Sequence, residues 1–127
     1  MTIPPARKIV LIIEDDADIR TFTCRVIEFE GYTCLEAETS DETFRILKEN
    51  DINLVLLDLR LVDNNGWLLL AQLKSNPETK SIPVIVFTAS FGEQQRAQAL
   101  KMGAVDYLVK PLSATMLKDA INRGLSA

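Results

Sequence analysis

Five side chains that can take part in chemistry each follow an apolar run of this chain. They are Glu14, Asp15, Asp58, Thr88 and Lys110. Taken singly, each has a commoner structural role, because acids favour helix N-termini, Asp and Thr cap turns and helices, and most lysines are solvated charges. Taken together they offer three carboxylates, a hydroxyl and an ammonium group. They can act together only if the fold brings them to one place.

The apolar runs before these residues predict the strands of a buried sheet. The runs cover residues 9–13, 54–57, 82–87 and 105–109, with a weaker one at 32–37. Amphipathic or capped stretches between them predict helices over residues 17–30, from 40 or 41 onward, 67–75, 92–101 and after 111. Five strand–helix alternations predict a single doubly wound α/β domain, a (βα)5 fold with a parallel sheet and helices on both faces.

Several helix details follow from the pattern. Gly31 is placed to end the first helix, and Ser40 or Asp41 can cap the second. The fourth helix has a thin apolar face, chiefly Leu100, which predicts a loosely held element. The residues expected to face inward are Ile19, Phe22, Val26 and Phe29 in the first helix, Phe44 and Leu47 in the second, and Met116, Ala120, Ile121 and Leu125 in the last.

A sheet of strand order 2-1-3-4-5 would set the first and third strands side by side and so gather the three carboxylates at one edge. Three anions packed closely repel each other strongly unless a divalent cation joins them. Oxygen ligands without His or Cys favour a hard ion, and a few carboxylates plus waters suit Mg²⁺. A carboxylate nucleophile beside Mg²⁺, a lysine and a hydroxyl is equipped for phosphoryl transfer onto the carboxylate.

The composition narrows the possible functions. The chain has 127 residues, which suits one domain, expected over residues 8–127 after a leader at 1–7. A net charge of −4 and the lack of a basic stripe argue against direct nucleic-acid binding. There is no histidine, so the commonest general base and metal ligand is missing. No apolar run is long enough for a signal peptide or a membrane span, so a cytoplasmic protein is expected.

The two cysteines, Cys24 and Cys34, are too few for a disulfide scaffold and wrongly spaced for a zinc site. We expect two small, buried or half-buried thiols in a reducing compartment.

The ordered set of residues resembles the receiver domain of two-component response regulators, over nearly the whole chain from Lys8 to Leu125. The matching motifs are Glu14-Asp15, Asp58, Gly66, Thr88-Ala89, Gly103-Ala104-Val105-Asp106-Tyr107 and Lys110-Pro111. The resemblance implies a phosphorylation-dependent signalling domain that acts only on itself, by its own phosphorylation and autodephosphorylation. Its expected partners are a histidine kinase or phosphotransfer protein and a downstream protein or effector domain.

The resemblance also implies a role for each matching residue. Asp58 is the expected phosphoacceptor, with Thr88 and Lys110 binding the phosphoryl oxygens. Mg²⁺ is expected at Asp15, Asp58, the Arg60 backbone carbonyl and, through water, Glu14. Thr88 and Tyr107 are the expected switch pair, and the Lys110–Pro111 bond is expected to be cis.

Departures from the family pattern are informative. Val62 stands where the family usually has proline, and Glu14 stands where Asp is commoner. Arg60 and Ser90 occupy variable positions at which the lifetime of the phosphoryl group is tuned in the family. We hypothesise that Arg60 can lie over the phosphoryl group and obstruct the attacking water.

Other interpretations remain. An Mg²⁺ phosphohydrolase with an aspartyl nucleophile would place a second Asp two residues after it, where this chain has Arg60. A degenerate receiver could act as a constitutive interaction module. A nucleotide-binding fold would need a glycine-rich turn after the first strand, which is missing. The surface of the fourth helix, fifth strand and fifth helix, with Lys101, Asp106 and Arg123, could form a homodimer or bind a partner.

Overall fold

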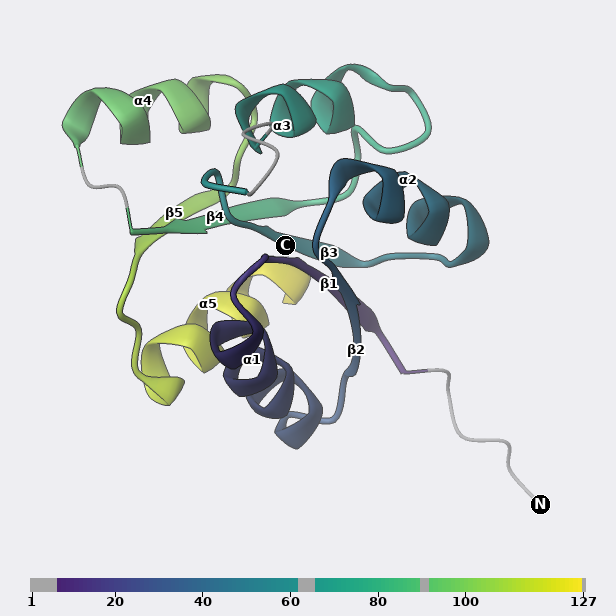
Figure 1. The fold of residues 1–127 in the computed structure, drawn as a ribbon, viewed down its shortest axis with the longest axis vertical. Helices are drawn as coiled ribbons and strands as arrows, with labels where there is room; N and C mark the ends of the chain where they lie inside the picture. Colours follow the sequence, from purple (N-terminus) through teal and green to yellow (C-terminus); the bar gives the residue numbers. More distant parts are fainter. Residues whose placement is uncertain (1–6, 62–65, 90–91, 127) are drawn as a thin grey trace.

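Five strands alternate with five helices in the computed structural model, which describes residues 7–61, 66–89 and 92–126 (Figure 1). The elements are β1 (Ile9–Ile13), α1 (Ala17–Phe29), β2 (Thr33–Ala37), α2 (Ser40–Glu49), β3 (Leu54–Leu57), α3 (Gly66–Ser75), β4 (Val84–Thr88), α4 (Glu93–Lys101), β5 (Asp106–Val109) and α5 (Ala114–Ser126). The predicted alternation is confirmed, with boundaries that differ by one or two residues. The expected leader falls mostly on residues 1–6, outside the described part of the chain.

The sheet has the predicted strand order, β2-β1-β3-β4-β5, and all its neighbours pair in parallel. Helices α2, α3 and α4 cover one face, and α1 and α5 cover the other (Figure 1). The register sets Ile13 beside both Ala37 and Leu57, so the carboxyl ends of three strands lie level. This alignment gives the residues that follow each strand a common edge.

The core lies on both faces of the sheet because its central strands are apolar throughout. All four residues of β3 are fully buried, and they alternate between two core clusters. Val55 and Leu57 pack beneath α2, α3 and α4, while Leu54 and Leu56 pack against α1 and α5. Burial of each such side chain stabilises the fold by about 1.5–3 kcal/mol. The strand that precedes Asp58 is therefore a rigid support.

The predicted inner face of α1 is partly wrong. Phe22 is 45% and Phe29 is 91% exposed, whereas Thr23, Cys24 and Ile27 are the buried residues of the helix. Ile19 and Val26 pack at the margin of the core. The helix carries apolar residues around more than one side, and periodicity alone does not decide which side meets the sheet. The predicted end is confirmed, since Gly31 adopts the left-handed φ of +91° of a C′ glycine.

Two details of other helices also differ from expectation. The N-cap of α2 is Thr39, whose Oγ1 accepts a hydrogen bond from the Glu42 N–H at 3.2 Å. Neither Ser40 nor Asp41 is therefore the N-cap residue.

The inner faces of the other helices agree with the prediction in part. Met116 in α5 is 55% exposed, while Ala120 and Ile121 are buried as predicted. Phe44, Leu47 and Leu125 pack against the core. The thin apolar face of α4 is confirmed, with Ala99 as its buried residue and Leu100 37% exposed.

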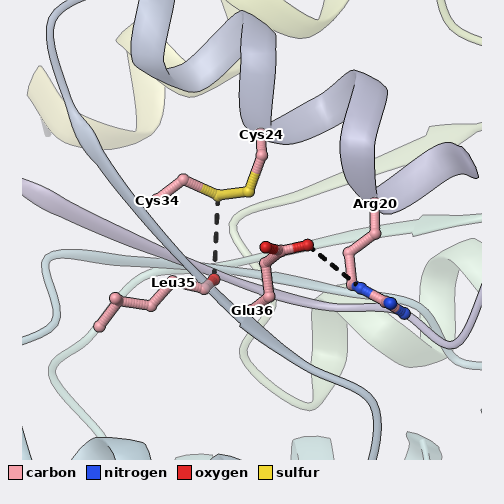
Figure 2. Close-up of a disulfide and its surroundings, with 5 residues drawn as sticks. All are labelled: Arg20, Cys24, Cys34, Leu35 and Glu36. Carbon is pink, nitrogen blue, oxygen red and sulfur yellow. Dashed lines mark hydrogen bonds and ion pairs between the residues drawn. A yellow bond between two sulfur atoms is a disulfide. The ribbon is translucent and has the colours of Figure 1, made fainter. Parts of the chain in front are cut away.

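The expectation of two free thiols is wrong, because Cys24 and Cys34 form a disulfide (Figure 2). Cys24 lies on the buried side of α1, Cys34 lies in β2, and their Cα atoms are 5.6 Å apart. The helix and the strand are consecutive and pack together, so a ten-residue separation in sequence becomes a direct contact. Spacing alone could not show this, because it depends on which side of α1 meets β2.

No helix in the described ranges has both the length and the apolar character that crossing a bilayer requires.

Candidate acidic functional site

Three carboxylates meet where β1 and β3 end. Glu14 and Asp15 follow β1, and Asp58 follows β3 directly. The Asp58 N–H donates to the Ile13 carbonyl at 3.0 Å, which continues the sheet pairing and sets the two strand ends side by side. One carboxylate oxygen from each residue lies within 4.8 Å of the others. The structure therefore brings together the acidic cluster that the strand order predicted.

Burial makes this cluster costly without a cation. Glu14 is 0% and Asp58 4% exposed, while Asp15 is half-buried. Lys110, which follows β5, supplies the compensating charge: its Nζ lies 2.9 Å from Asp58 Oδ2 and also forms an ion pair with Glu14 Oε1. A buried charge needs such a paired and hydrogen-bonded partner. One ammonium group thus joins the ends of β1, β3 and β5.

The lysine is itself held in position. The backbone N–H of Lys110 donates to the Thr88 carbonyl at 2.9 Å, and the side-chain Nζ lies 4.7 Å from the centre of the Phe87 ring. The Lys110–Pro111 bond is cis, as expected. Thr88, the last residue of β4, is fully buried. The ends of β4 and β5 therefore position the cationic side of the site.

Backbone groups hold the carboxylates. The Arg60 N–H donates to Asp58 Oδ1 at 2.9 Å, while the Arg60 side chain is exposed. The Asp16 N–H donates to Glu14 Oε2 at 3.5 Å. The backbone of Glu14 is also held. Its N–H donates to the Ala37 carbonyl at 3.0 Å, and the Glu14 carbonyl accepts a hydrogen bond from Arg20 Nη1 at 2.8 Å. Glu14 is thereby fixed by contacts from both α1 and β2.

The two buried acids differ in proton affinity. Burial, reinforced by the hydrogen bond and negative charge of Asp58, raises the pKa of Glu14 from 4.5 to about 8, although Lys110 opposes this shift. Burial also disfavours ionised Asp58, but hydrogen bonds from Glu14, the Arg60 N–H and Lys110 outweigh it and hold the pKa of Asp58 below its usual value. Asp58 is therefore ionised at neutral pH without any general base.

The donor set fits a hard divalent cation. It consists of the carboxylates of Glu14, Asp15 and Asp58, and oxygen-only ligation of this kind suits Mg²⁺. Burial is the main cause of the raised pKa of Glu14, and the nearby negative charge of Asp58 adds to it. Asp15 is the most accessible of the three carboxylates. A cation bound among these groups would relieve the repulsion between them.

The other residues singled out in the sequence lie around this centre or outside the described ranges. Tyr107 is 4% exposed and its hydroxyl donates to Gln95 Oε1 of α4 at 3.4 Å. Ser90 and Val62 lie outside the described ranges. Sequence reasoning missed the contact of Arg20 with Glu14 and the placement of Phe87 beside Lys110. No motif marks either residue, since both contacts depend on how the helices and strands pack.

Comparisons with known proteins point to one protein family. The response regulator receiver domain family model matches residues 10–122. The phosphate regulon transcriptional regulatory protein PhoB of Pseudomonas aeruginosa is 38% identical over 106 residues, 84% of this chain and 46% of that protein. Its Escherichia coli counterpart is 40% identical over 104 residues, 82% of this chain and 45% of that protein. The chain thus spans about half the length of these curated relatives.

A solved structure gives the same result for the fold and extends over almost the whole chain. The CheY-like response regulator receiver domain protein of Methanospirillum hungatei superposes with a TM-score of 0.86 at 29% identity and covers 95% of each chain.

Proposed function

The chain belongs to the response regulator receiver domain family, and on that premise we propose that Asp58 accepts a phosphoryl group with the help of Mg²⁺. The donor would be a sensor histidine kinase or a phosphotransfer protein. Modification of Asp58 would then alter the surface formed by α4, β5 and α5 and so control the binding of a partner.

The observation that carries this proposal is the joint contact of Lys110 with the two buried acids. An ammonium group placed 2.9 Å from Asp58 can offset the charge of an incoming phosphoryl group and the charge that develops in the transition state. The lysine reaches this position from β5, on the other side of β4, so the strand order itself assembles the site.

The transfer step uses groups that are already in the required state. An ionised Asp58 oxygen attacks phosphorus, and the bond from phosphorus to the donor imidazole nitrogen breaks, which leaves an acyl phosphate and a free imidazole. The low pKa of Asp58 makes a general base unnecessary. Asp15, Asp58, the Arg60 carbonyl and, through water, Glu14 would hold the Mg²⁺, which would supply further charge stabilisation. The domain would catalyse only its own phosphorylation and dephosphorylation.

The response to phosphorylation is assigned to Thr88 and Tyr107. Thr88 ends β4 beside the site and would donate a hydrogen bond to a phosphoryl oxygen. Tyr107 lies one strand away and contacts α4 through Gln95. A displaced Thr88 would change the space available to Tyr107 and bias α4, whose apolar face is thin. Partner binding that depends on phosphorylation requires a partner with different affinities for the two states.

The α4–β5–α5 surface is the proposed site of partner binding or of homodimer formation. It carries Lys101 and an exposed ion pair in which Arg123 Nη2 lies 3.3 Å from Asp106 Oδ2. We propose residues 8–127 as the receiver domain, acting in the cytoplasm with protein partners rather than with nucleic acid or a membrane. Its output would come through a bound protein or an effector domain.

Small-molecule phosphodonors test the function directly. Incubation with acetyl phosphate and Mg²⁺ should add one phosphoryl group, detected as a mass increase, and beryllofluoride should bind under the same conditions. Asp58→Asn should abolish the modification, whereas Asp41→Asn, which changes an exposed acid of α2, should leave it unchanged. A wild-type protein that is never modified would indicate a constitutive interaction module. Turnover of many phosphomonoesters would instead indicate a phosphohydrolase.

A further inference from the structure

The disulfide is one of two adjacent ties between α1 and the edge strand β2 (Figure 2). The other is made by Arg20, one helical turn before Cys24, whose Nε lies 3.2 Å from Glu36 and whose Nη2 lies 3.0 Å from Glu38. Residues four apart share one face of a helix, so both ties leave α1 on the same side. Glu36 and Glu38 are about half exposed, and ion pairs of this kind hold a helix only weakly. The covalent bond is therefore the stronger of the two ties.

Arg20 connects these ties to the acidic site. The Nη1 of the same guanidinium donates to the Glu14 carbonyl at 2.8 Å. The segment from Glu14 to Asp16 links β1 to α1, and the Asp16 side chain caps the helix by accepting from the Asp18 and Ile19 N–H groups. A change in how α1 sits on β2 would therefore be passed to the backbone that carries Glu14 and Asp15.

The two cysteines of the disulfide differ in exposure. Cys34 is half-buried and Cys24 is 7% exposed, so an attacking thiolate reaches Cys34 first. The Cys34 Sγ lies 3.9 Å from the Leu35 carbonyl oxygen, an acceptor for the thiol formed on reduction. In the cytoplasm, which is the compartment proposed above, protein disulfides are usually transient and redox-sensing rather than permanent.

We propose that Cys24 and Cys34 form a reversible thiol–disulfide exchange site whose redox state alters the Glu14–Asp15 segment. A dithiol reductant attacks Cys34 Sγ, which breaks the bond to Cys24 and releases the Cys24 thiolate. The second thiol of the reductant then displaces Cys34, so that the protein gains two thiols and the reductant becomes a disulfide. A disulfide of glutathione class reverses the reaction. The effect on Mg²⁺ and phosphorylation rests on the proposed function.

The exchange is tested on the native full chain. The protein is equilibrated with mixtures of reduced and oxidised dithiothreitol or glutathione, quenched with a maleimide and weighed by mass spectrometry, with circular dichroism recorded in parallel. The expected result is a reversible transition between a monomer with no label and one with two labels, without loss of secondary structure. A bond that is reduced only in denaturant, or that never forms, would overturn the proposal. Cys34→Ser should show no transition.

The coupling is tested by amide chemical shifts of the oxidised and reduced proteins. The Glu14 and Asp15 signals should differ between the two forms, whereas Lys101 on the far side of the sheet should not change. In Arg20→Met the cysteines should still exchange, but the redox-dependent shift at Glu14 should shrink, and Arg20→Lys should restore part of it. Shifts confined to the neighbours of Cys24 and Cys34, or an undiminished shift in Arg20→Met, would show that the disulfide is only structural.

The functional consequence is measured by Mg²⁺ titration of both forms. Reduction should weaken Mg²⁺ binding by roughly two- to tenfold, the size of coupling expected between neighbouring parts of one fold, and the Cys34→Ser variant should match the reduced protein under all conditions. Equal affinities would overturn the coupling to the site. If neither form binds Mg²⁺ or is modified at Asp58, the proposed phosphoacceptor function fails, while the thiol and chemical-shift measurements still decide whether the exchange site exists.

Discussion

The Nζ of Lys110 lies 2.9 Å from Oδ2 of Asp58 and also binds the fully buried carboxylate of Glu14. This contact joins residues that follow the fifth, third and first strands of the sheet. It explains why the two acids tolerate burial, and it makes the charge balance of the site sensitive to protons, to metal and to loss of the lysine.

The free energy of unfolding should fall between about pH 5 and 8 in the absence of metal. Burial beside Asp58 raises the pKa of Glu14 to about 8. The folded protein therefore binds this proton more tightly than the unfolded chain does. The stability that results is lost as the pH rises from 4.5 through about 8, and the free energy of unfolding falls by at most about 1.4 kcal/mol per pH unit. Urea unfolding at several pH values measures this. Glu14→Gln should flatten the slope, and a flat wild-type profile would contradict the assignment.

Lys110→Met should lower the stability of the metal-free protein by about 3 to 5 kcal/mol, because it leaves two acids buried without their cation. It should also raise the pKa of Glu14 further, since the lysine lowers that pKa. Added Mg²⁺ should recover part of the loss. Chemical denaturation with and without Mg²⁺ measures both effects. Lys101→Met, at an exposed position, is the control, and equal stability of the two variants would argue against a structural role for Lys110.

Gly66→Ala should cost about 2 kcal/mol or more, because a Cβ on Gly66 would lie 2.2 Å from the Leu59 carbonyl oxygen. Leu59 follows Asp58, so the clash would also disturb the site. Gly92→Ala is the matched control, since its nearest neighbour would be a flexible side chain at 3.9 Å. Thermal and urea unfolding compare the two variants. Equal effects would mean that the start of α3 can move away from Leu59 at little cost.

Reduction of the disulfide should lower the free energy of unfolding by roughly 2 to 3 kcal/mol, the loop-closure contribution of a bond across ten residues. Urea unfolding with and without a dithiol reductant measures the difference. The double variant Cys24→Ala, Cys34→Ala should be insensitive to the reductant. An unchanged wild-type midpoint would show either that the bond is resistant to the reductant or that it does not stabilise the fold, and thiol counting separates these two cases.

Arg60→Ala should speed the loss of the phosphoryl group from Asp58 several-fold if the exposed Arg60 side chain obstructs the attacking water. The backbone N–H that binds Asp58 Oδ1 stays in the variant, so the acceptor should remain positioned. Decay of the phosphorylated protein, followed by mass spectrometry, gives the rate. Arg45→Ala, on the exposed face of α2, controls for a general change of charge, and an unchanged rate in Arg60→Ala would exclude the shielding role.

The sequence predicted the fold and the acidic cluster because both follow from local patterns. Apolar runs marked the strands, and parallel strands bring the residues after them to one edge, so the sequence pattern alone groups Glu14, Asp15, Asp58 and Lys110. Their pattern also matched a family whose motifs are ordered and specific.

Features that depend on helix rotation could not be predicted in the same way. The apolar side chains of Phe22 and Phe29 suggested the wrong side of α1, and the correct side is the one that sets Cys24 against Cys34. The contact of Arg20 with the Glu14 carbonyl has the same origin. A residue pattern specifies which elements are amphipathic, whereas the rotation of each helix is decided by packing against neighbours distant in sequence.

The acidic cluster and its lysine follow β1, β3 and β5, and among the described residues β2 and α2 contribute none of these four side chains. The turn between α2 and β3, residues 50–53, lies at the opposite edge of the sheet from the cluster, because it precedes β3 whereas Asp58 follows it. Ile52 of this turn is buried, and Asn53 exchanges two hydrogen bonds with the Ile9 backbone, at 2.8 and 2.9 Å, so both must stay in place. A protein engineer could therefore insert a fluorescent reporter or a second domain at the exposed Asp51, since exposed turn positions with few essential contacts tolerate such insertions.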